Sequence, residues 1–138
     1  MAIKSVPKFR QGAELDPTGH DQILRESYLH LQLDHPNIVK LYDIYEDADE
    51  YHSVLEYCEG GTLSKRVQSL TEKQASQILR QVLRALNYMH KTSNIVHRDV
   101  KAENVLFKSE DPTDLTIKLC DFGFAIKVPE GISPKHLN

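Results

Sequence analysis

The sequence predicts an α+β fold in which a small antiparallel sheet with one helix precedes a more helical part. Three observations favour it. A helix-period run ending near residue 33 is followed by two β-type runs, a capping motif at Thr71 opens a long amphipathic helix, and short apolar runs return after Asn94. The 138 residues suit one domain of the common size, about 100 to 150 residues. With 40% hydrophobic and 27% charged residues, the composition excludes disordered, collagen-like and coiled-coil chains.

Two helices are expected. The first follows a Gly- and Pro-containing loop over residues 11–21, takes Asp21 as its N-cap, and ends before Pro36, which disfavours helix at the preceding residue. The second begins at Thr71, where Gln74 completes an S/T-x-x-E/Q capping box. Its apolar residues recur at helical spacing and are expected to form the core: Ala75, Ile78, Leu79, Val82, Leu83, Leu86 and Met89.

The β-type runs predict a hairpin and several short strands. Residues 38–45 and 52–57 flank an acidic turn at 46–50, and Gly60-Gly61 ends the second run. Shorter runs follow at residues 95–96, 105–107 and 115–119. The Gly-containing segment 59–62 predicts a boundary between an N-terminal part, residues 1–59, and a C-terminal part, residues 60–138.

The charge and the cysteine content of the chain argue against several classes of function. A net charge of -3 gives no positive field for nucleic acid or anionic lipid, and no stretch approaches the roughly 20 apolar residues of a membrane span. Cys58 and Cys120 form no CxxC pair, which favours free thiols in a reducing, cytoplasmic compartment. The seven histidines contain no H-x-x-x-H pair, so zinc is not expected. We therefore expect a soluble cytoplasmic protein with neither nucleic-acid nor membrane partners.

Two segments, His97–Asn104 and Asp121–Gly123, contain the candidate catalytic and metal-binding residues. Phosphoryl transfer needs a carboxylate that orients the attacking hydroxyl, a cation for the phosphates and oxygen ligands for Mg²⁺. Asp99 can supply the first and Lys101 the second, while Asn104 and Asp121 offer the hard oxygen donors that suit Mg²⁺. Alone, either segment also fits a capping aspartate or a strand-ending turn. Together they favour phosphoryl transfer.

In order and spacing, these segments resemble the signature of eukaryotic protein kinases, with HRDVKAEN as the catalytic loop and DFG as the metal loop. The resemblance extends upstream. Ala2-Ile3-Lys4 resembles the end of the family's V-A-I-K strand, Glu26 falls where a helix glutamate pairs with that lysine, and residues 35–39 resemble the turn after that helix. The sequence Tyr-Cys-Glu-Gly-Gly at residues 57–61, which resembles the hinge between the two halves of the kinase domain, and the long 108–116 connection are most like those of calcium-dependent and calcium/calmodulin-dependent kinases.

The resemblance implies a protein-kinase-like fold and transfer of the γ-phosphate of ATP to a serine or threonine of a protein, with Mg²⁺ as cofactor. By this carry-over Asp99 orients the hydroxyl, Lys101 neutralises the γ-phosphate, and Asn104 and Asp121 hold the metal. The implied ATP contacts are Ala2 and Leu106 around the adenine, Leu55 as gatekeeper, Glu56 and Cys58 at the hinge, Lys4 with Glu26 at the phosphates, and Glu103 and Asp121.

Some features depart from the family pattern. The Gly-rich phosphate loop and the A-P-E motif are not in this sequence, which spans about half of the family's domain. We expect this part alone to be inactive and marginally folded, so the alternative is a catalytically inactive binding or decoy module. Thr62 stands where many kinases that prefer basic substrates have a glutamate, which predicts weak selection for an upstream arginine. His30 occupies a helix position that is usually apolar and contacts the DFG phenylalanine.

Overall fold

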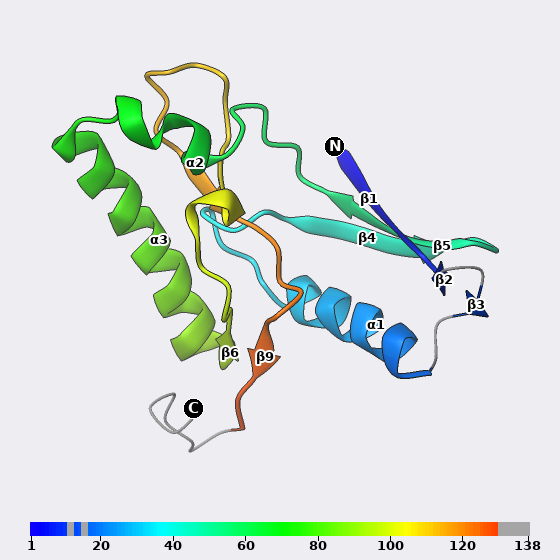
Figure 1. Cartoon of the computed structure of the whole chain (residues 1–138). Helices are drawn as coiled ribbons and strands as arrows, with labels where there is room; N and C mark the ends of the chain where they lie inside the picture. The colour runs from blue at the N-terminus through cyan, green and yellow to red at the C-terminus, as the bar shows by residue number, and fades with distance from the viewer. Residues whose placement is uncertain (11–12, 15–16, 130–138) are drawn as a thin grey trace.

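A computed structural model describes residues 1–10, 13–14 and 17–129 of the chain (Figure 1). The largest sheet and helix α1 lie next to each other on the right of the molecule, and helix α3 lies on the left (Figure 1). The strands are β1 (Ala2–Pro7), β2 (Phe9–Arg10), β3 (Ala13–Glu14), β4 (Leu41–Glu46), β5 (Glu50–Leu55), β6 (Ile95–Val96), β7 (Val105–Phe107), β8 (Ile117–Leu119) and β9 (Ile126–Lys127). The helices are α1 (Pro17–Leu31), α2 (Leu63–Arg66) and α3 (Glu72–Thr92), with short 3-10 turns at Val67–Ser69 and Ala102–Asn104.

The largest sheet has the order β1-β5-β4, with both pairings antiparallel. The predicted hairpin is confirmed, although β4 starts only at Leu41 and its register shifts between Leu41 and Asp43. The expectation that the strand begins at residue 38 was wrong. Ile38 instead forms an isolated parallel bridge with Leu119 of β8, because the segment before β4 leaves the sheet and lies against the C-terminal part.

Helix α1 begins at Pro17, so the predicted N-cap at Asp21 was wrong. Proline suits the first turn of a helix, where the missing N–H would have had no partner and φ is already helical. The predicted loop is also shorter than expected, because residues 13–14 pair with residues 9–10. Residues 11–12 and 15–16 of that predicted loop lie outside the described residues. The C-terminal end is confirmed, since the helix stops at Leu31.

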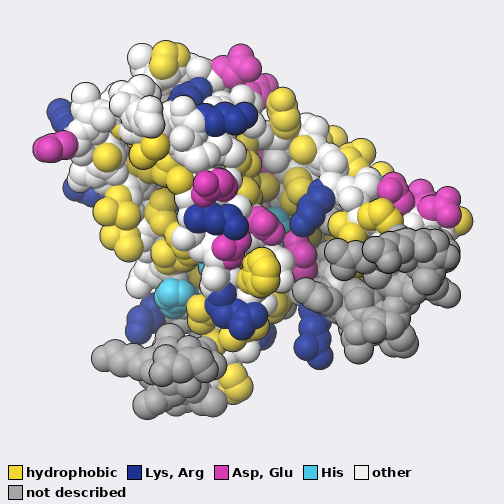
Figure 2. All heavy atoms as spheres, in the orientation of Figure 1, with side chains coloured by type: hydrophobic (Ala, Val, Ile, Leu, Met, Phe, Trp, Pro, Cys, Tyr) yellow, Lys and Arg dark blue, Asp and Glu magenta, His cyan; other side chains and the backbone are white. Residues whose placement is uncertain are grey.

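Helix α3 confirms the predicted capping box. The Thr71 side chain accepts from the Gln74 N–H, and the Gln74 side chain accepts from the Thr71 N–H. The buried positions are Ile78, Val82, Ala85 and Met89. The prediction that the whole apolar stripe is core was wrong for Leu79 and Leu83, which are 57% and 56% exposed. Each follows a buried residue by one position, a rotation of about 100° around the helix, and Figure 2 shows hydrophobic side chains at the surface on this side.

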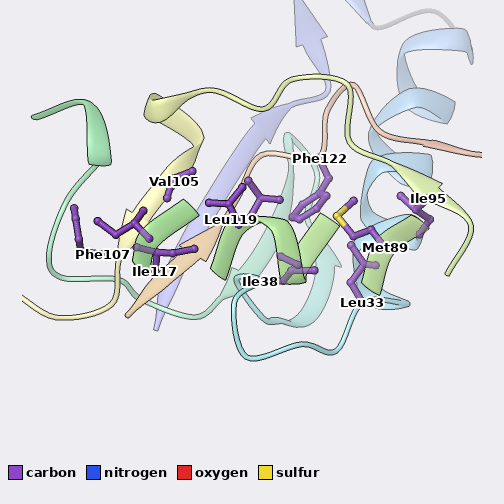
Figure 3. Packing of buried hydrophobic residues seen from close by; sticks show 12 residues of the cluster. Leu33, Ile38, Met89, Ile95, Val105, Phe107, Ile117, Leu119 and Phe122 are labelled. Carbon is purple, nitrogen blue, oxygen red and sulfur yellow. The ribbon is translucent and has the colours of Figure 1, made fainter. Parts of the chain in front are cut away.

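The core joins the N-terminal and C-terminal parts of the chain. Figure 3 shows side chains from the turn after α1 packed with those of α3 and of the later strands. Phe107 and Phe122 are among the largest fully buried side chains, and burying such a side chain contributes about 1.5 to 3 kcal/mol. The labelled members of this cluster are Leu33, Ile38, Met89, Ile95, Val105, Phe107, Ile117, Leu119 and Phe122. Among the described residues, no helix is both long and apolar enough to cross a membrane.

Gly60 and Gly61, in the connection between β5 and α2, hold this connection against β7. The Gly60 amide donates to the Phe107 carbonyl at 3.1 Å, and the Phe107 amide donates to the Gly61 carbonyl at 2.8 Å. A Cβ on Gly60 would collide with the Ser109 carbonyl oxygen, so no other residue fits this close approach. Gly61 has φ of +72°, where glycine lacks the steric penalty of other residues.

Candidate active site

A cavity of about 480 Å³ lies between the sheet, α1 and the loops that contain the two signature segments. Its walls come from segments far apart in sequence, including β1, α1, the end of β5, β7 and the residues after β8. The lining residues are Ala2, Lys4, Glu26, Ser27, His30, Val39, Leu41, Ser53, Leu55, Glu56, Tyr57, Cys58, Asn104, Leu106, Cys120, Asp121 and Phe122. The fold therefore gathers most of the predicted ATP-binding residues around one space.

An ion pair joins β1 to α1 at one wall of the cavity. The Lys4 Nζ lies 2.8 Å from the Glu26 Oε1, as the resemblance implied, and the two side chains are 47% and 25% exposed. A pair this exposed contributes about 0 to 1 kcal/mol to stability. Its importance is therefore geometric, because it fixes a cation in the cavity and ties that cation to the helix.

The loop after β6 presents Asp99. Its Oδ2 accepts hydrogen bonds from Lys101 Nζ at 2.7 Å and from Asn104 Nδ2 at 2.8 Å. Asn104 Nδ2 also donates to the Asp99 carbonyl at 2.9 Å, which ties the amide to both ends of this residue. Because Nδ2 faces Asp99, the Asn104 Oδ1 faces away from it. The three predicted catalytic residues thus form one hydrogen-bonded group.

The neighbouring charges determine how Asp99 titrates. The Lys101 ammonium, followed by the Asn104 amide, lowers the pKa of the Asp99 carboxyl, and Asp99 in turn raises the pKa of Lys101. At neutral pH Asp99 is therefore an anion with one oxygen held by two donors, and Lys101 keeps its positive charge. This carboxylate is better suited to orienting a hydroxyl than to removing its proton early.

His97 connects the Asp99 loop to the segment that contains Asp121. The Asp99 N–H donates to His97 Nδ1 at 3.2 Å, so the proton is on Nε2, which lies 3.1 Å from the Cys120 carbonyl oxygen. Burial lowers the pKa of His97, which keeps the ring neutral and this tautomer in place. The Cys120 amide also donates to the Asn104 carbonyl at 2.9 Å. These bonds hold the two signature loops in register with each other.

Asp121 has a left-handed backbone, with φ of 63°. Such a conformation is uncommon for residues other than glycine and clusters at functional sites. The Gly123 amide donates to the Asp121 Oδ1 at 3.3 Å and helps to hold the turn. The Asp121 carboxylate and the Asn104 amide line the same cavity and offer oxygen donors, which fits Mg²⁺. Within the described residues, no group of three or more His, Cys, Asp or Glu side chains could hold a metal by itself.

The opposite end of the cavity is mostly apolar. Ala2, Leu55 and Leu106 line it, together with Glu56 and Cys58 of the segment after β5. Burial raises the pKa of the Cys58 thiol, and that of Cys120 to about 11, so both are neutral thiols near pH 7. This agrees with Cys58 acting through packing rather than as a reactive thiolate.

Glu56 makes a contact that the sequence analysis did not anticipate. Its Oε2 lies 2.8 Å from the Lys118 Nζ of β8 and accepts from the Lys40 N–H at 3.2 Å. Lys118 interrupts the apolar residues Ile117 and Leu119, and a charge in an otherwise buried strand was the available signal. The hinge residue is therefore tied directly to the strand that leads to Asp121.

The structure does not place every predicted residue in the cavity wall. Asp99 and Lys101 lie beside it, linked through Asn104, whereas Glu103 is exposed in the 3-10 turn and does not line it. The role of Glu103 in ATP binding stays a prediction. Val39 and Leu41 also line the cavity and were not predicted, although their two-residue spacing and the apolar alternation of this segment could have suggested them.

Comparison with known proteins agrees with this geometry. Residues 1–137 match the protein kinase domain family. Calcium-dependent protein kinase 5 of Plasmodium falciparum is 42% identical over 110 residues, which cover 78% of this chain and 19% of that protein. Calcium-dependent protein kinase 4 of Plasmodium berghei is 41% identical over 127 residues, covering 90% of this chain and 23% of that protein. A probable myosin light chain kinase of Dictyostelium discoideum is 44% identical over 107 residues, which cover 75% of this chain and 33% of that protein.

The chain belongs to the protein kinase domain family. The predicted kinase-like α+β fold and the predicted resemblance to calcium-dependent kinases are confirmed. The chain spans about a fifth of the length of these two calcium-dependent kinases.

Proposed function

We propose that this chain supplies the ATP site and the catalytic loop of a protein serine/threonine kinase. The observation that carries the proposal is the Asp99, Lys101 and Asn104 group, hydrogen-bonded beside a cavity that also holds the Lys4–Glu26 ion pair and Asp121. A fixed carboxylate, two cations and two metal-type oxygen donors in and beside one cavity are the parts that phosphoryl transfer requires.

In the proposed reaction, the substrate hydroxyl oxygen forms a bond to the γ-phosphorus of ATP while the bond from that phosphorus to the ADP oxygen breaks. Asp99 accepts a hydrogen bond from the hydroxyl and receives its proton as the phosphoester forms. Because its pKa is lowered, Asp99 orients the hydroxyl at first and takes the proton late. Lys101, bonded to the same carboxylate, is near enough to share in neutralising the transferred phosphate.

The remaining residues bind and orient. Lys4, held by Glu26, is the cation for the α and β phosphates, and the apolar end around Ala2, Leu55 and Leu106 suits the adenine ring. Glu56 and Cys58 would contact the adenine edge through backbone groups. Asn104 and Asp121 are the residues that would hold Mg²⁺, which when bound would neutralise phosphate charge.

We also propose the substrate class of this kinase and its location in the cell. Lys101 and Glu103 follow the serine/threonine pattern, and the calcium-dependent kinases are matching relatives, so the substrate is a serine or threonine of a protein. Residues 1–59 correspond to part of the N-terminal lobe of a kinase domain, and residues 60–138 correspond to part of its C-terminal lobe. Cys58 and Cys120 are both free thiols, which supports a cytoplasmic, reducing location.

The test is Asp99→Asn in the full-length polypeptide, with transfer from radiolabelled ATP to a mixed serine/threonine peptide library. We expect kcat to fall by about 10² to 10⁴, because the amide cannot receive the proton, while the KM for ATP changes little. The control is Asp49→Asn, an exposed aspartate in the hairpin turn, which should leave kcat unchanged. Near-normal turnover of Asp99→Asn would overturn the assignment.

A further inference from the structure

A row of cations runs along the outer side of α3. Its members are Lys73, Arg80, Arg84 and Lys91, and all four are exposed. At about 100° per residue they lie within about 40° of one another around the helix axis, and at about 1.5 Å per residue the row is roughly 27 Å long. Figure 2 shows Lys and Arg side chains at the left edge of the molecule, over α3. We call this row the basic stripe.

The basic stripe faces away from the core and from the candidate active site. The buried residues of α3 are Ile78, Val82, Ala85 and Met89, and their mean direction lies about 150° around the helix axis from the stripe. Among the described residues, none that lines the cavity comes from α3. A partner bound to the stripe would therefore leave the cavity accessible.

The cations of the basic stripe have no neighbouring acid. Within the described residues, none of the four forms an ion pair or a side-chain hydrogen bond. Five lysines elsewhere in the fold each lie 2.7 to 2.8 Å from a carboxylate oxygen, and these are Lys4, Lys8, Lys40, Lys101 and Lys118. The stripe therefore differs from the usual pairing of lysines in this fold.

The sequence of α3 does not neutralise the stripe either. Glu72 is the only acid of this helix, and it lies about 100° around the axis from Lys73. Arg80 and Arg84 are four residues apart, a spacing at which like charges destabilise a helix. A bound anion would relieve this repulsion.

The charge of the whole chain restricts the kind of anion that fits. The chain has 20 Asp and Glu against 17 Lys and Arg, whereas α3 has four Lys and Arg and one acid. The positive charge is thus confined to one narrow row, whereas a nucleic acid or an anionic membrane would also meet the acidic remainder of the surface. A short run of carboxylates would meet the stripe alone. An extended peptide rises about 3.3 Å per residue, so roughly eight residues match the length of the stripe.

We propose that the basic stripe is a docking surface for an extended acidic segment of a partner protein, with about eight residues rich in Asp and Glu lying along α3. Exposed charge pairs are individually weak and are screened by salt, so the affinity comes from the four cations together and falls as salt rises. The proposal is independent of the proposed function, because the stripe contains none of the residues assigned to ATP or to phosphoryl transfer.

The experiment titrates a fluorescein-labelled octapeptide of glutamate with the full-length polypeptide at low salt and measures fluorescence anisotropy. The double variant Arg80→Gln with Arg84→Gln removes the two central charges and keeps good helix-forming residues. We expect it to weaken binding by about fivefold, the effect of two exposed charge pairs. The matched control is Lys65→Gln with Lys108→Gln, which removes two exposed cations outside α3 and should change the affinity by less than about twofold.

A second pair of substitutions keeps the test decisive if the first pair lowers the Tm. Lys73→Gln with Lys91→Gln removes the two outer charges and should also weaken binding, whereas an octapeptide of glutamine should bind none of the proteins. Equal losses for the stripe variants and for the control would overturn the proposal, because binding would then follow net charge alone. Absence of binding by the wild type would overturn it as well.

The same titration with a single-stranded oligonucleotide and with vesicles of anionic lipid decides the class of partner. We expect both to bind more weakly than the glutamate octapeptide. If either binds more tightly and loses affinity in Arg80→Gln with Arg84→Gln, the stripe serves that anion and the assignment to an acidic protein segment is wrong. Turnover of Asp99→Asn tests the proposed function separately, so failure of one leaves the other standing.

Discussion

The buried ion pair between Glu56 and Lys118 should be one of the most sensitive polar contacts in this fold. The two side chains are 16% and 10% exposed, and their charged atoms are 2.8 Å apart. Replacing Lys118 by methionine keeps most of the volume but leaves the carboxylate without its cation, with the Lys40 amide at 3.2 Å as a remaining donor. Removing one partner of a fully buried pair costs about 3 to 5 kcal/mol, because an uncompensated charge stays in the protein. Glu56 is only partly buried and lines the cavity, so we expect a smaller loss of about 1 to 3 kcal/mol for Lys118→Met.

Urea unfolding of the full-length polypeptide, followed by fluorescence, would measure the loss. Glu56→Gln should also destabilise, and the double variant should lose less than the sum of the two single losses, with a coupling of about 0.5 to 3 kcal/mol. The matched control is Lys40→Met, which breaks the exposed pair with Asp34 and should cost about 0 to 1 kcal/mol. If Lys118→Met costs no more than Lys40→Met, or if the double-variant losses are additive, then the buried pair does not stabilise the hinge as argued.

Two further predictions concern backbone fit and pH. Gly60→Ala should destabilise by about 1 to 3 kcal/mol, measured as a lower Tm, because its Cβ meets the Ser109 carbonyl. It should cost more than Gly61→Ala, whose Cβ has open space and which meets only the backbone strain of a φ of +72°. Burial lowers the pKa of His30 and His97, so below about pH 6.5 the unfolded chain binds protons more readily than the folded chain. The free energy of unfolding should therefore fall from pH 7.5 to 5.5 in urea titrations, and should fall less in His30→Gln; equal slopes would contradict this.

Local chemistry explains which elements the sequence predicted well. The start of α3 was predictable because Thr71 and Gln74 satisfy each other's backbone groups without help from the rest of the fold. The start of α1 was not, because a proline and a polar stretch are compatible with either a loop or a first helical turn. Leu79 and Leu83 were wrongly predicted as core. Apolar spacing identifies the apolar stripe of a helix, but it does not say how much of that stripe is buried by the rest of the fold.

The candidate site was predictable where its residues form short motifs. Asp99, Lys101 and Asn104 come from one loop, so their short spacing in the sequence already indicates that their side chains lie close together. The contacts of Glu56 with Lys118 and of His30 with Val39 depend on how distant segments pack, and a single residue type does not reveal its partner. Their only sign in the sequence is a polar residue where the pattern expects an apolar one.

The parallel contact between the segment before β4 and β8 determines how the cavity can open. Leu119 donates to the Asn37 carbonyl and accepts from the Val39 amide, and the Asn37 side chain donates to Gln81 of α3. Residues 37–39 are thereby fixed to the C-terminal part, although they precede most of the sheet. The Glu56 amide donates to the Lys40 carbonyl at 2.8 Å, where the two strands leave the sheet together. Any tilt of the sheet against the C-terminal part should therefore pivot about an axis through Lys40 and Glu56.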